Sequence, residues 1–336
     1  MNHDIIAIGG SAGSGTVLKR LVRDLPADFE PSVFVTTHIP ADGSMLPDLL
    51  AEGANLPVLR AVDGMPVEPG RIYIAPADRH MLLVDSTVRL GHGPRENMSR
   101  PAIDPMFRSA AYAYGPRVIG VVLSGYLNDG ASGLHAIKQC GGLTVVQHPV
   151  DAHAEQMPRS ALEAVEVDHV ATAANMAELL GQLAKTPAEG GRAPTRELEL
   201  EIRIAAGARV SGAALRSFAE PSAISCPDCH GVLSEVKVEG PLRYRCQIGH
   251  AYTAEVFMHE QQGQVDEALS VALRLMEERL TLVERMAEEA HQQGRNAVAE
   301  LYGERAEEYR GHVETLRRGA VLAMVTSRQP AEEEAG

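Results

Sequence analysis

The chain has 336 residues, of which 45% are hydrophobic, and a formal net charge of −14. This length and apolar content suffice for a globular protein of about two to three domains. The negative charge repels phosphate backbones, which argues against a nucleic-acid partner and favours a protein partner. The longest apolar runs, such as Val118–Leu123, are too short to cross a bilayer, and Met1–Asp4 lacks the features of a secretory signal. We therefore expect a cytoplasmic protein with no direct membrane insertion.

The first half of the chain alternates short β-branched runs with helical patterns. We expect strands at 4–8, 32–37, 71–75, 117–124 and 143–147, and helices near 14–24, 43–53, 103–114, 130–139 and 175–184. Such alternation predicts an α/β fold with a doubly wound, mostly parallel sheet and helices on both faces. Residues 1–185 form this first domain.

The pattern changes after Leu183, where 185–194 are rich in turn-forming residues. We expect a linker at 186–222 that few contacts cross, a zinc-ribbon-like module at 223–256, and a helical hairpin at 257–328. The hairpin is predicted from two apolar seams and a polar turn at 291–295. The seams are Val265, Leu269, Ala272, Met276, Leu280 and Val283, and Val298, Tyr302, Tyr309, Val313 and Leu316.

Ser11 lies between glycines directly after the apolar run Ile5–Ile8. Glycines on both sides allow the backbone to turn sharply, which exposes a hydroxyl at the end of a strand as a candidate nucleophile. The spacing of Gly9, Gly13 and Gly15 is also compatible with a phosphate-binding loop. A third alternative is that Ser11 caps the helix that follows.

Two further polar residues follow predicted strands. His38 follows the second strand, and Asp129 lies in the loop after Val118–Leu123. Because parallel strands end at the same edge of a sheet, these side chains and Ser11 can converge there. A neutral imidazole that accepts the hydroxyl proton and a carboxylate that orients it would make the serine a nucleophile. Singly, His38 is also compatible with a loop residue and Asp129 with a turn or helix cap.

The dinucleotide alternative lacks supporting residues. None of the eight tyrosines is followed four residues later by lysine, as a short-chain dehydrogenase would require. The second strand ends in His38 instead of an acid that could bind a ribose hydroxyl. We therefore expect no cofactor for catalysis.

Several motifs together resemble the chemotaxis protein-glutamate methylesterases of the CheB type over residues 3–184. They are Ile8–Gly13, His38–Pro40, Gly70–Met81, Arg100–Asp104, Gly125–Gly130 and Met157–Arg159. The resemblance implies a Ser11, His38 and Asp129 triad that hydrolyses γ-glutamyl methyl esters on the cytoplasmic helices of methylated chemoreceptors. It also implies deamidation of receptor glutamines as a second reaction.

Two departures from the family pattern lie near the nucleophile. The family usually has Thr where this chain has Ala12, and Met-Gly where it has Tyr126-Leu127. Ala12 and Tyr126 fall in the expected oxyanion and substrate loop, and leucine in place of glycine at 127 removes cheap access to positive φ. A reshaped loop would leave a different class of protein, a catalytically degenerate adaptor that binds receptors or signalling proteins.

The resemblance also bears on regulation. Family members commonly place a phosphorylatable receiver ahead of the esterase, whereas here the esterase pattern begins at residue 4. We therefore expect control by a separate regulatory protein instead of phosphorylation within this chain.

Three of the four cysteines form a metal-ligand pattern with a histidine. Cys226 and Cys229 are followed, after 16 intervening residues, by Cys246 and then His250. This spacing predicts a closed, tetrahedral zinc site of structural type, formed by two turns that meet across a hairpin. His230 is an alternative ligand, although it directly follows Cys229. The simpler alternative is a set of reduced, buried cysteines, which is what we expect for Cys140.

Overall fold

The computed structural model describes residues 1–39 and 45–326. Residues 43–44 of one expected helix and 327–328 of the expected hairpin lie outside this described part. The chain divides into two compact units, Met1–Phe257 and the segment that begins at Met258.

The first unit is built on a seven-stranded sheet in which every neighbouring pair is parallel. Its strands are β1 (Ile5–Gly10), β2 (Ser32–Thr37), β3 (Val58–Arg60), β5 (Ile72–Ile74), β8 (Val118–Val122), β9 (Leu143–Gln147) and β10 (His169–Ala171), in the order β10-β9-β8-β1-β2-β5-β3. The five expected strands are confirmed. The two edge strands, β3 and β10, were not expected, because three residues are too few to show a periodic pattern.

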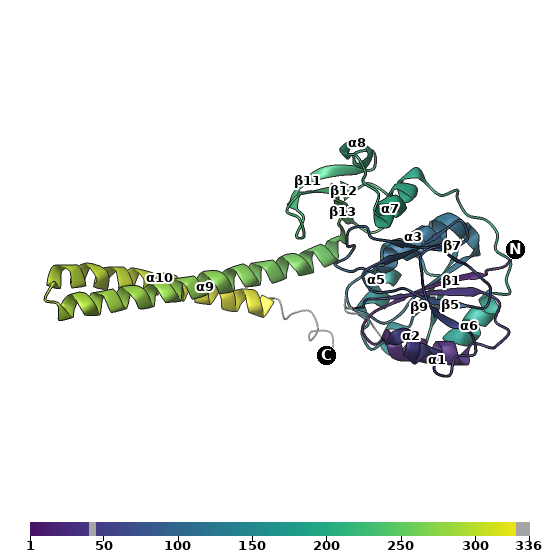
Figure 1. Cartoon of the computed structure of the whole chain (residues 1–336), viewed down its shortest axis with the longest axis horizontal. Helices are drawn as coiled ribbons and strands as arrows, with labels where there is room; N and C mark the ends of the chain where they lie inside the picture. Colours follow the sequence, from purple (N-terminus) through teal and green to yellow (C-terminus); the bar gives the residue numbers. More distant parts are fainter. Residues whose placement is uncertain (40–44, 327–336) are drawn as a thin grey trace. The chain divides into compact units, whose positions relative to one another are not determined.

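Helices cover both faces of this sheet, as the sequence predicts (Figure 1). On one face lie α1 (Ser14–Asp24), α2 (Leu46–Ala51) and α6 (Met176–Leu183), and on the other α3 (Ile103–Tyr114), α4 (Ala131–Gln139) and α5 (Gln156–Ala164). Side chains of β1 alternate between the two cores. Ile6 and Ile8 pack with α1, whereas Ile5 and Ala7 pack with α3. The fold is therefore doubly wound.

The strand order reverses beside β1. From β1 the chain proceeds to β2 on one side and later to β8 on the other. The carboxyl ends of β1 and β8 therefore flank the switch point, where open α/β sheets form their functional crevice.

A small antiparallel sheet within residues 65–91 was not expected from the sequence. It contains β4 (Met65–Pro66), β6 (His80–Val84) and β7 (Thr87–Gly91). One-turn helices η1 (Gly115–Arg117) and η2 (Pro149–Asp151) complete the connections.

The expectation of a linker with few contacts at 186–222 is wrong. This segment contains α7 (Arg196–Ala206) and α8 (Gly212–Leu215), and α7 buries Leu198, Ile202 and Ala205 in the core shared with α3. Their spacing of four and three residues places all three on one helical face. The turn-forming residues before 195 led to the prediction of a linker, so the amphipathic pattern of α7 was not recognised.

Residues 219–253 form a four-stranded antiparallel sheet, which we call the ribbon. Its strands are β11 (Ala219–Ser225), β12 (Val232–Val236), β13 (Arg243–Cys246) and β14 (Ala251–Thr253). A turn at 237–242 joins β12 to β13. The ribbon core comprises Cys226, Leu233, Cys246, Tyr252, Val256 and Phe257.

A buried charge cluster joins the ribbon to α7 and the first domain. Arg245 is fully buried and donates to Glu96 at 3.1 Å and to Glu201 of α7 at 3.0 Å. Arg243 donates to Glu201 at 2.7 Å, and Arg108 of α3 pairs with Glu96. These interactions make the ribbon part of the first unit.

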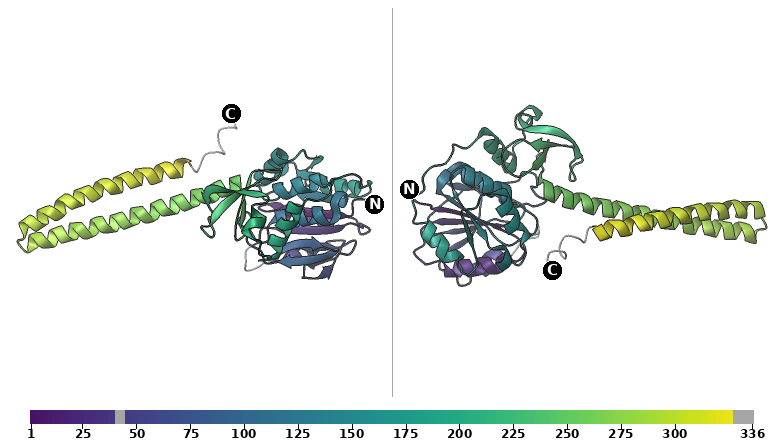
Figure 2. Two further views of the ribbon diagram at one scale, coloured as in Figure 1. Left: turned by 90° about the horizontal axis from the view of Figure 1, so that it is seen from above. Right: turned by 180° about the vertical axis from the view of Figure 1, so that it is seen from behind.

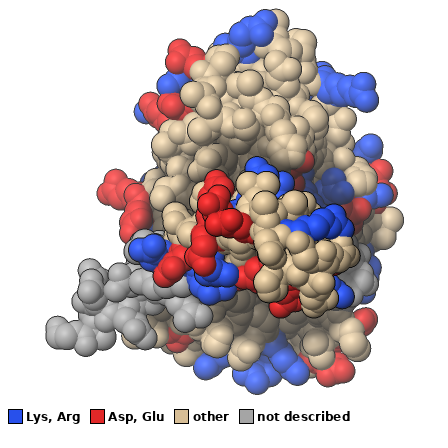
Figure 3. All heavy atoms as spheres, turned by 90° about the vertical axis from the view of Figure 1, so that its left-hand side faces the viewer, with Lys and Arg blue, Asp and Glu red and all other residues tan. Residues whose placement is uncertain are grey.

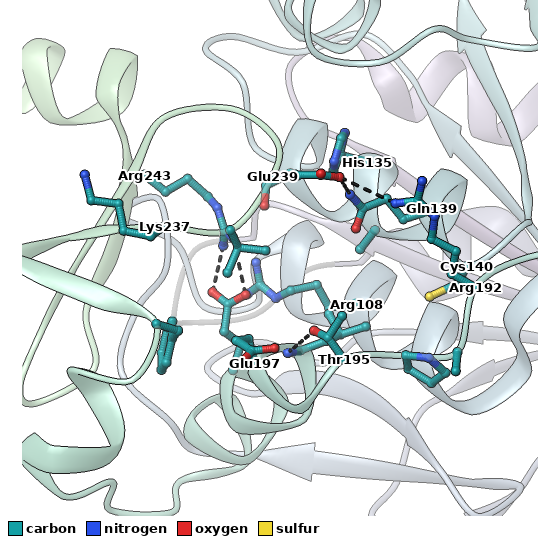
Figure 4. Close-up of a pocket in the computed structure, with 18 of the residues that line it drawn as sticks. Arg108, His135, Gln139, Cys140, Arg192, Thr195, Glu197, Lys237, Glu239 and Arg243 are labelled. Carbon is teal, nitrogen blue, oxygen red and sulfur yellow. Dashed lines mark hydrogen bonds and ion pairs between the residues drawn. The ribbon is translucent and has the colours of Figure 1, made fainter.

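A cavity of about 370 Å³ lies beside this cluster (Figure 4). Figure 4 shows Arg243 reaching in from the ribbon and Arg108 from α3, and Gln139 of α4 donates to Glu239 at 2.7 Å. None of the three expected triad residues lines the cavity. It marks the junction of α4, α7 and the ribbon.

The second unit is an antiparallel helical hairpin, as predicted. Helix α10 (Asn296–Thr326) runs back along α9 (Ala254–Gln292) in both views of Figure 2. Ion pairs fix the direction, since Arg317 pairs with Glu277 at 2.5 Å and Arg310 with Glu284 at 2.6 Å.

The predicted apolar seams are only partly buried. Val283 and Val313 lie in the interface, whereas Val265 and Val298 are exposed. On the face drawn in Figure 3, acidic and basic side chains are interspersed. Within residues 1–39 and 45–326, no helix combines the length and the apolar character needed to span a membrane.

Candidate active site and metal-binding cluster

Ser11 is the first residue after β1. Gly10 pairs with Thr37 at the end of β2, so Ser11 and His38 occupy adjacent positions in register just beyond the sheet edge. The Ser11 N–H donates to the Ser124 carbonyl at 2.8 Å, which ties the turn to the end of β8. Gly13, at φ +77°, begins α1 without a side-chain cap bond, so Ser11 does not cap that helix.

His38 and Asp129 are in direct contact. The His38 Nε2 lies 2.7 Å from the Asp129 Oδ2, and the histidine side chain is 24% exposed. Asp129 also accepts the N–H of Ile103 at 2.7 Å and the Asn97 amide at 2.9 Å. The carboxylate is therefore fixed on one side by buried donors and holds the imidazole on the other.

The electrostatics of Asp129 follow from these contacts. Burial alone would raise its pKa, but hydrogen bonding and charge from His38, with the Ile103 N–H and Asn97, hold the pKa of Asp129 below its ordinary value. The group therefore stays ionised beside the imidazole, as the orienting member of a triad must.

The position of Ser11 relative to the Asp129 loop is set by Gly125. A Cβ at Gly125 would lie 2.9 Å from the Cβ of Ser11 and 2.0 Å from the Met157 sulfur, so only glycine allows this approach. Among the described residues, the Ser11 hydroxyl has no hydrogen-bond partner. Ser11 and His38 are thus neighbours that are not hydrogen-bonded here, a common state of catalytic pairs without substrate.

The backbone N–H groups near Ser11 differ in whether they already have a hydrogen-bond acceptor. Gly125 donates to the Ala154 carbonyl at 3.0 Å and Leu127 to the Gln156 side chain at 2.9 Å. In contrast, the N–H groups of Ala12 and Tyr126 have no partner among the described residues. They are the available donors for an oxyanion.

Leu127 adopts φ +61°, the conformation that glycine would take cheaply. Leucine in place of the family's glycine therefore keeps the left-handed backbone conformation at position 127. A reshaped loop would require residue 127 to leave that conformation. Tyr126 beside it is 58% exposed and presents its ring at the protein surface.

Sequence reasoning missed the roles of two buried residues that contact Asp129. The Asn97 amide bridges Asp129 and the Oδ2 of Asp104, 3.1 Å away. Burial and the nearby Asp129 charge raise the pKa of Asp104 to about 7. Asp104 belongs to a motif quoted above without a role, whereas no local pattern marks Asn97.

The predicted metal ligands are brought together. The donor atoms of Cys226, Cys229, Cys246 and His250 all lie within 4.8 Å of one another. The Cys229 and Cys246 sulfurs are 3.7 Å apart, and His250 Nδ1 lies 3.7 Å from Cys226 and 3.5 Å from Cys246. A tetrahedron with zinc–sulfur bonds of about 2.3 Å has ligand–ligand edges of about 3.8 Å, so these residues fit zinc.

The remaining histidine and cysteine considered in the sequence analysis, His230 as an alternative ligand and Cys140 as a buried core residue, lie outside this group. His230 is absent from the cluster, and Cys140 is buried in the main core among Ile137 and other apolar residues. Burial and the neighbouring thiols raise the pKa of Cys246 to about 12, which disfavours a thiolate unless a cation is bound.

Comparison with known proteins identifies relatives of the first domain. The CheB methylesterase family model matches residues 6–180. A putative protein-glutamate methylesterase/protein-glutamine glutaminase of Leptospira interrogans is 39% identical over 186 residues, which are 54% of this chain and 96% of that protein. Protein-glutamate methylesterase/protein-glutamine glutaminase 2 of Anaeromyxobacter dehalogenans is 40% identical over 50% of this chain and 49% of its own length.

A solved structure agrees with these relatives. The Thermotoga maritima CheB methylesterase catalytic domain superposes with a TM-score of 0.53 and 31% identity, over 55% of this chain and all of that domain. The residues that the family model matches, 6–180, include Ser11, His38 and Asp129. The chain belongs to the CheB methylesterase family.

Proposed function

We propose that this chain is a cytoplasmic serine hydrolase that removes γ-methyl esters from glutamates of chemoreceptor helices and deamidates receptor glutamines. The observation that carries the proposal is the His38–Asp129 contact of 2.7 Å at the position next to Ser11 in register. The relatives, which are named as protein-glutamate methylesterases and protein-glutamine glutaminases, supply the substrate class.

The reaction would begin with attack of the Ser11 hydroxyl on the ester carbonyl, while His38 accepts the hydroxyl proton. Asp129 stabilises the imidazolium, and the N–H groups of Ala12 and Tyr126 donate to the developing oxyanion. His38 then protonates the leaving group, which is methanol from an ester or ammonia from an amide. Water, activated by His38, releases the glutamate and restores Ser11.

The alternative of a degenerate adaptor makes a different prediction for Ser11. An activated serine reacts with a fluorophosphonate, whereas an ordinary exposed serine does not. We expect one adduct per chain, located on Ser11 by peptide mass spectrometry, and no adduct in His38→Ala. A folded wild-type chain that remains unlabelled would favour the adaptor.

We also propose a structural zinc ion held by Cys226, Cys229, Cys246 and His250. The fit of their donor atoms to a tetrahedron supports it. Zinc would stabilise the ribbon and supply no catalytic step, because four protein ligands leave no open coordination position. Metal analysis of protein purified without chelators tests this proposal, with about one zinc per chain expected.

The helical hairpin would receive the receptor or a regulatory protein. Since α7 and the ribbon pack on the first domain, a truncation that tests the hairpin must end after Phe257 instead of near residue 185. We expect such a chain to hydrolyse a small ester normally and to lose turnover or regulation with intact receptor. Equal activity on receptor under every signalling condition would refute a role for the hairpin.

A further inference from the structure

Residues in and next to the ribbon contact the loop that carries Asp129. Leu127 packs against the ribbon core, together with Met98. The next residue, Asn128, accepts a hydrogen bond from Thr253 Oγ1 at 2.5 Å and donates to Glu255 at 2.5 Å. Two consecutive residues directly before the triad carboxylate are therefore fixed by residues around β14.

A second connection reaches Asp129 itself. Asn97 donates its backbone N–H to the Ala251 carbonyl at 2.8 Å and accepts the Thr253 N–H on its Oδ1 at 3.0 Å. These two bonds orient the side-chain amide, whose nitrogen donates to Asp129 at 2.9 Å. Asn97 thus links β14 to the carboxylate through a single side chain.

The metal ligands determine where β14 lies. His250 immediately precedes β14, and Cys246 ends β13, which pairs with it. Cys226 lies 3.5 Å from the Tyr252 hydroxyl, in the middle of β14. Binding of one ion by Cys246 and His250 would fix both ends of the turn that joins β13 to β14. Strand β14 in turn makes the contacts to the loop that carries Asp129.

We propose that the zinc-loaded ribbon holds the catalytic loop in position, with Asn97 and Asn128 as positioning residues for Asp129. This inference rests on the proposed triad chemistry. It makes esterase turnover depend on a metal that never contacts substrate, and it explains the leucine at 127. The Leu127 side chain packs against the ribbon core, a contact that glycine could not make.

The inference also differs from the sequence-based expectation that few contacts cross the linker between the first domain and the ribbon. The Leptospira relative and the Thermotoga domain match little more than half of this chain over nearly their whole length. The fold that these relatives share with the first domain therefore forms without a ribbon. We therefore propose the dependence of turnover on zinc for this chain, in which the loop that carries Asp129 contacts β14.

The test compares the full chain with zinc, after chelation, and after zinc is restored, using hydrolysis of p-nitrophenyl acetate. Displacement of the triad carboxylate by a fraction of an ångström to one ångström should lower kcat about 10- to 100-fold, while KM stays within about twofold. Restored zinc should recover kcat. Amide hydrogen exchange of residues 125–130 should accelerate without zinc, which reports loop order independently of activity.

Two zinc-loaded variants separate loop support from loss of the ribbon fold. Thr253→Val removes the hydroxyl bond to Asn128, and Asn97→Gly removes the amide but keeps the left-handed backbone, φ +48°, accessible. Each should retain zinc and lower kcat. We expect about a 3- to 10-fold decrease in Thr253→Val, the effect of one hydrogen bond to the loop, and at least that decrease in Asn97→Gly, which loses the side-chain bonds to Asp129, Asp104 and Thr253. Thr87→Val, which removes the hydrogen bond from the Thr87 hydroxyl of β7 to the Val84 carbonyl of β6, is the matched control and should not change kcat.

The outcomes distinguish this inference from the proposed function. Unchanged kcat and unchanged exchange in zinc-free, folded protein would overturn the inference, provided that Ser11→Ala is inactive. If chelation unfolds the chain, unchanged kcat in both zinc-loaded variants would overturn it. If wild type and Ser11→Ala hydrolyse the ester equally, the triad is wrong. Hydrogen exchange then still decides whether zinc orders the loop.

Discussion

Glu201 is the residue through which α7 holds the ribbon, and Glu201→Gln should be one of the most damaging conservative changes in the chain. Its carboxylate is 2% exposed and accepts hydrogen bonds from Arg243 at 2.7 and 3.3 Å and from Arg245 at 3.0 Å. The buried cluster contains three arginines and two glutamates. The substitution leaves three cations to one anion.

The magnitude follows from the geometry. Unit charges about 4 Å apart interact by about 4 kcal/mol at an effective dielectric constant of 20. Breaking a buried pair by neutralising one partner costs about 3–5 kcal/mol in measured cases, because the other charge stays buried. For a unit of this size that corresponds to a fall in Tm of roughly 6–20 °C.

Thermal and urea unfolding followed by circular dichroism would measure this change. The matched control is Glu199→Gln on the same helix, a carboxylate outside the cluster, which should alter the free energy of unfolding by at most about 0.5 kcal/mol. Equal effects of the two substitutions would show that the cluster does not hold the ribbon and α7 in place.

Three further predictions concern pH, the triad and the metal. Coulombic and hydrogen-bond interactions with the arginines outweigh burial and hold the pKa of Glu201 far below its ordinary value of about 4.5, so its stabilisation is complete above that pH and is lost as the pH falls. The difference in unfolding free energy between wild type and Glu201→Gln should therefore be full at pH 7 and narrow below about pH 4.5; a constant difference between pH 7 and pH 3 would contradict the assignment. Ser11→Ala and His38→Ala should each lower kcat by about three orders of magnitude or more, and the double variant should be hardly worse, because the two groups act as a unit; additive losses would refute the triad. Cys226→Ser should release zinc, which elemental analysis measures, whereas Cys140→Ser should keep it; zinc retained by Cys226→Ser would exclude that cysteine as a ligand.

The five inner strands of the parallel sheet were predictable because parallel, buried strands are continuous apolar runs that local sequence reveals. The positions of Ser11, His38 and Asp129 followed from the same topology, since each comes just after a strand that ends at one edge. The four candidate zinc ligands could be chosen from their spacing alone.

The contacts between the ribbon and the first domain could not be predicted in this way. They join residues far apart in sequence, such as Asn128 with Thr253 and Glu96 with Arg245. Charged residues in a sequence indicate a solvated surface unless their partners are known, so Glu96 and Glu201 gave no sign of burial. Asn97 likewise acquires its role only from the strand that packs against it.

The central claim is that this chain hydrolyses glutamate methyl esters through Ser11. The most direct measurement is the release of methanol from membranes that carry methylated chemoreceptors, with the wild-type chain and with folded Ser11→Ala at equal concentration. We expect methanol release by the wild type and background release by Ser11→Ala. Release at the same rate by both chains would contradict the claim, as would background release by a zinc-loaded wild type on every methylated receptor tested.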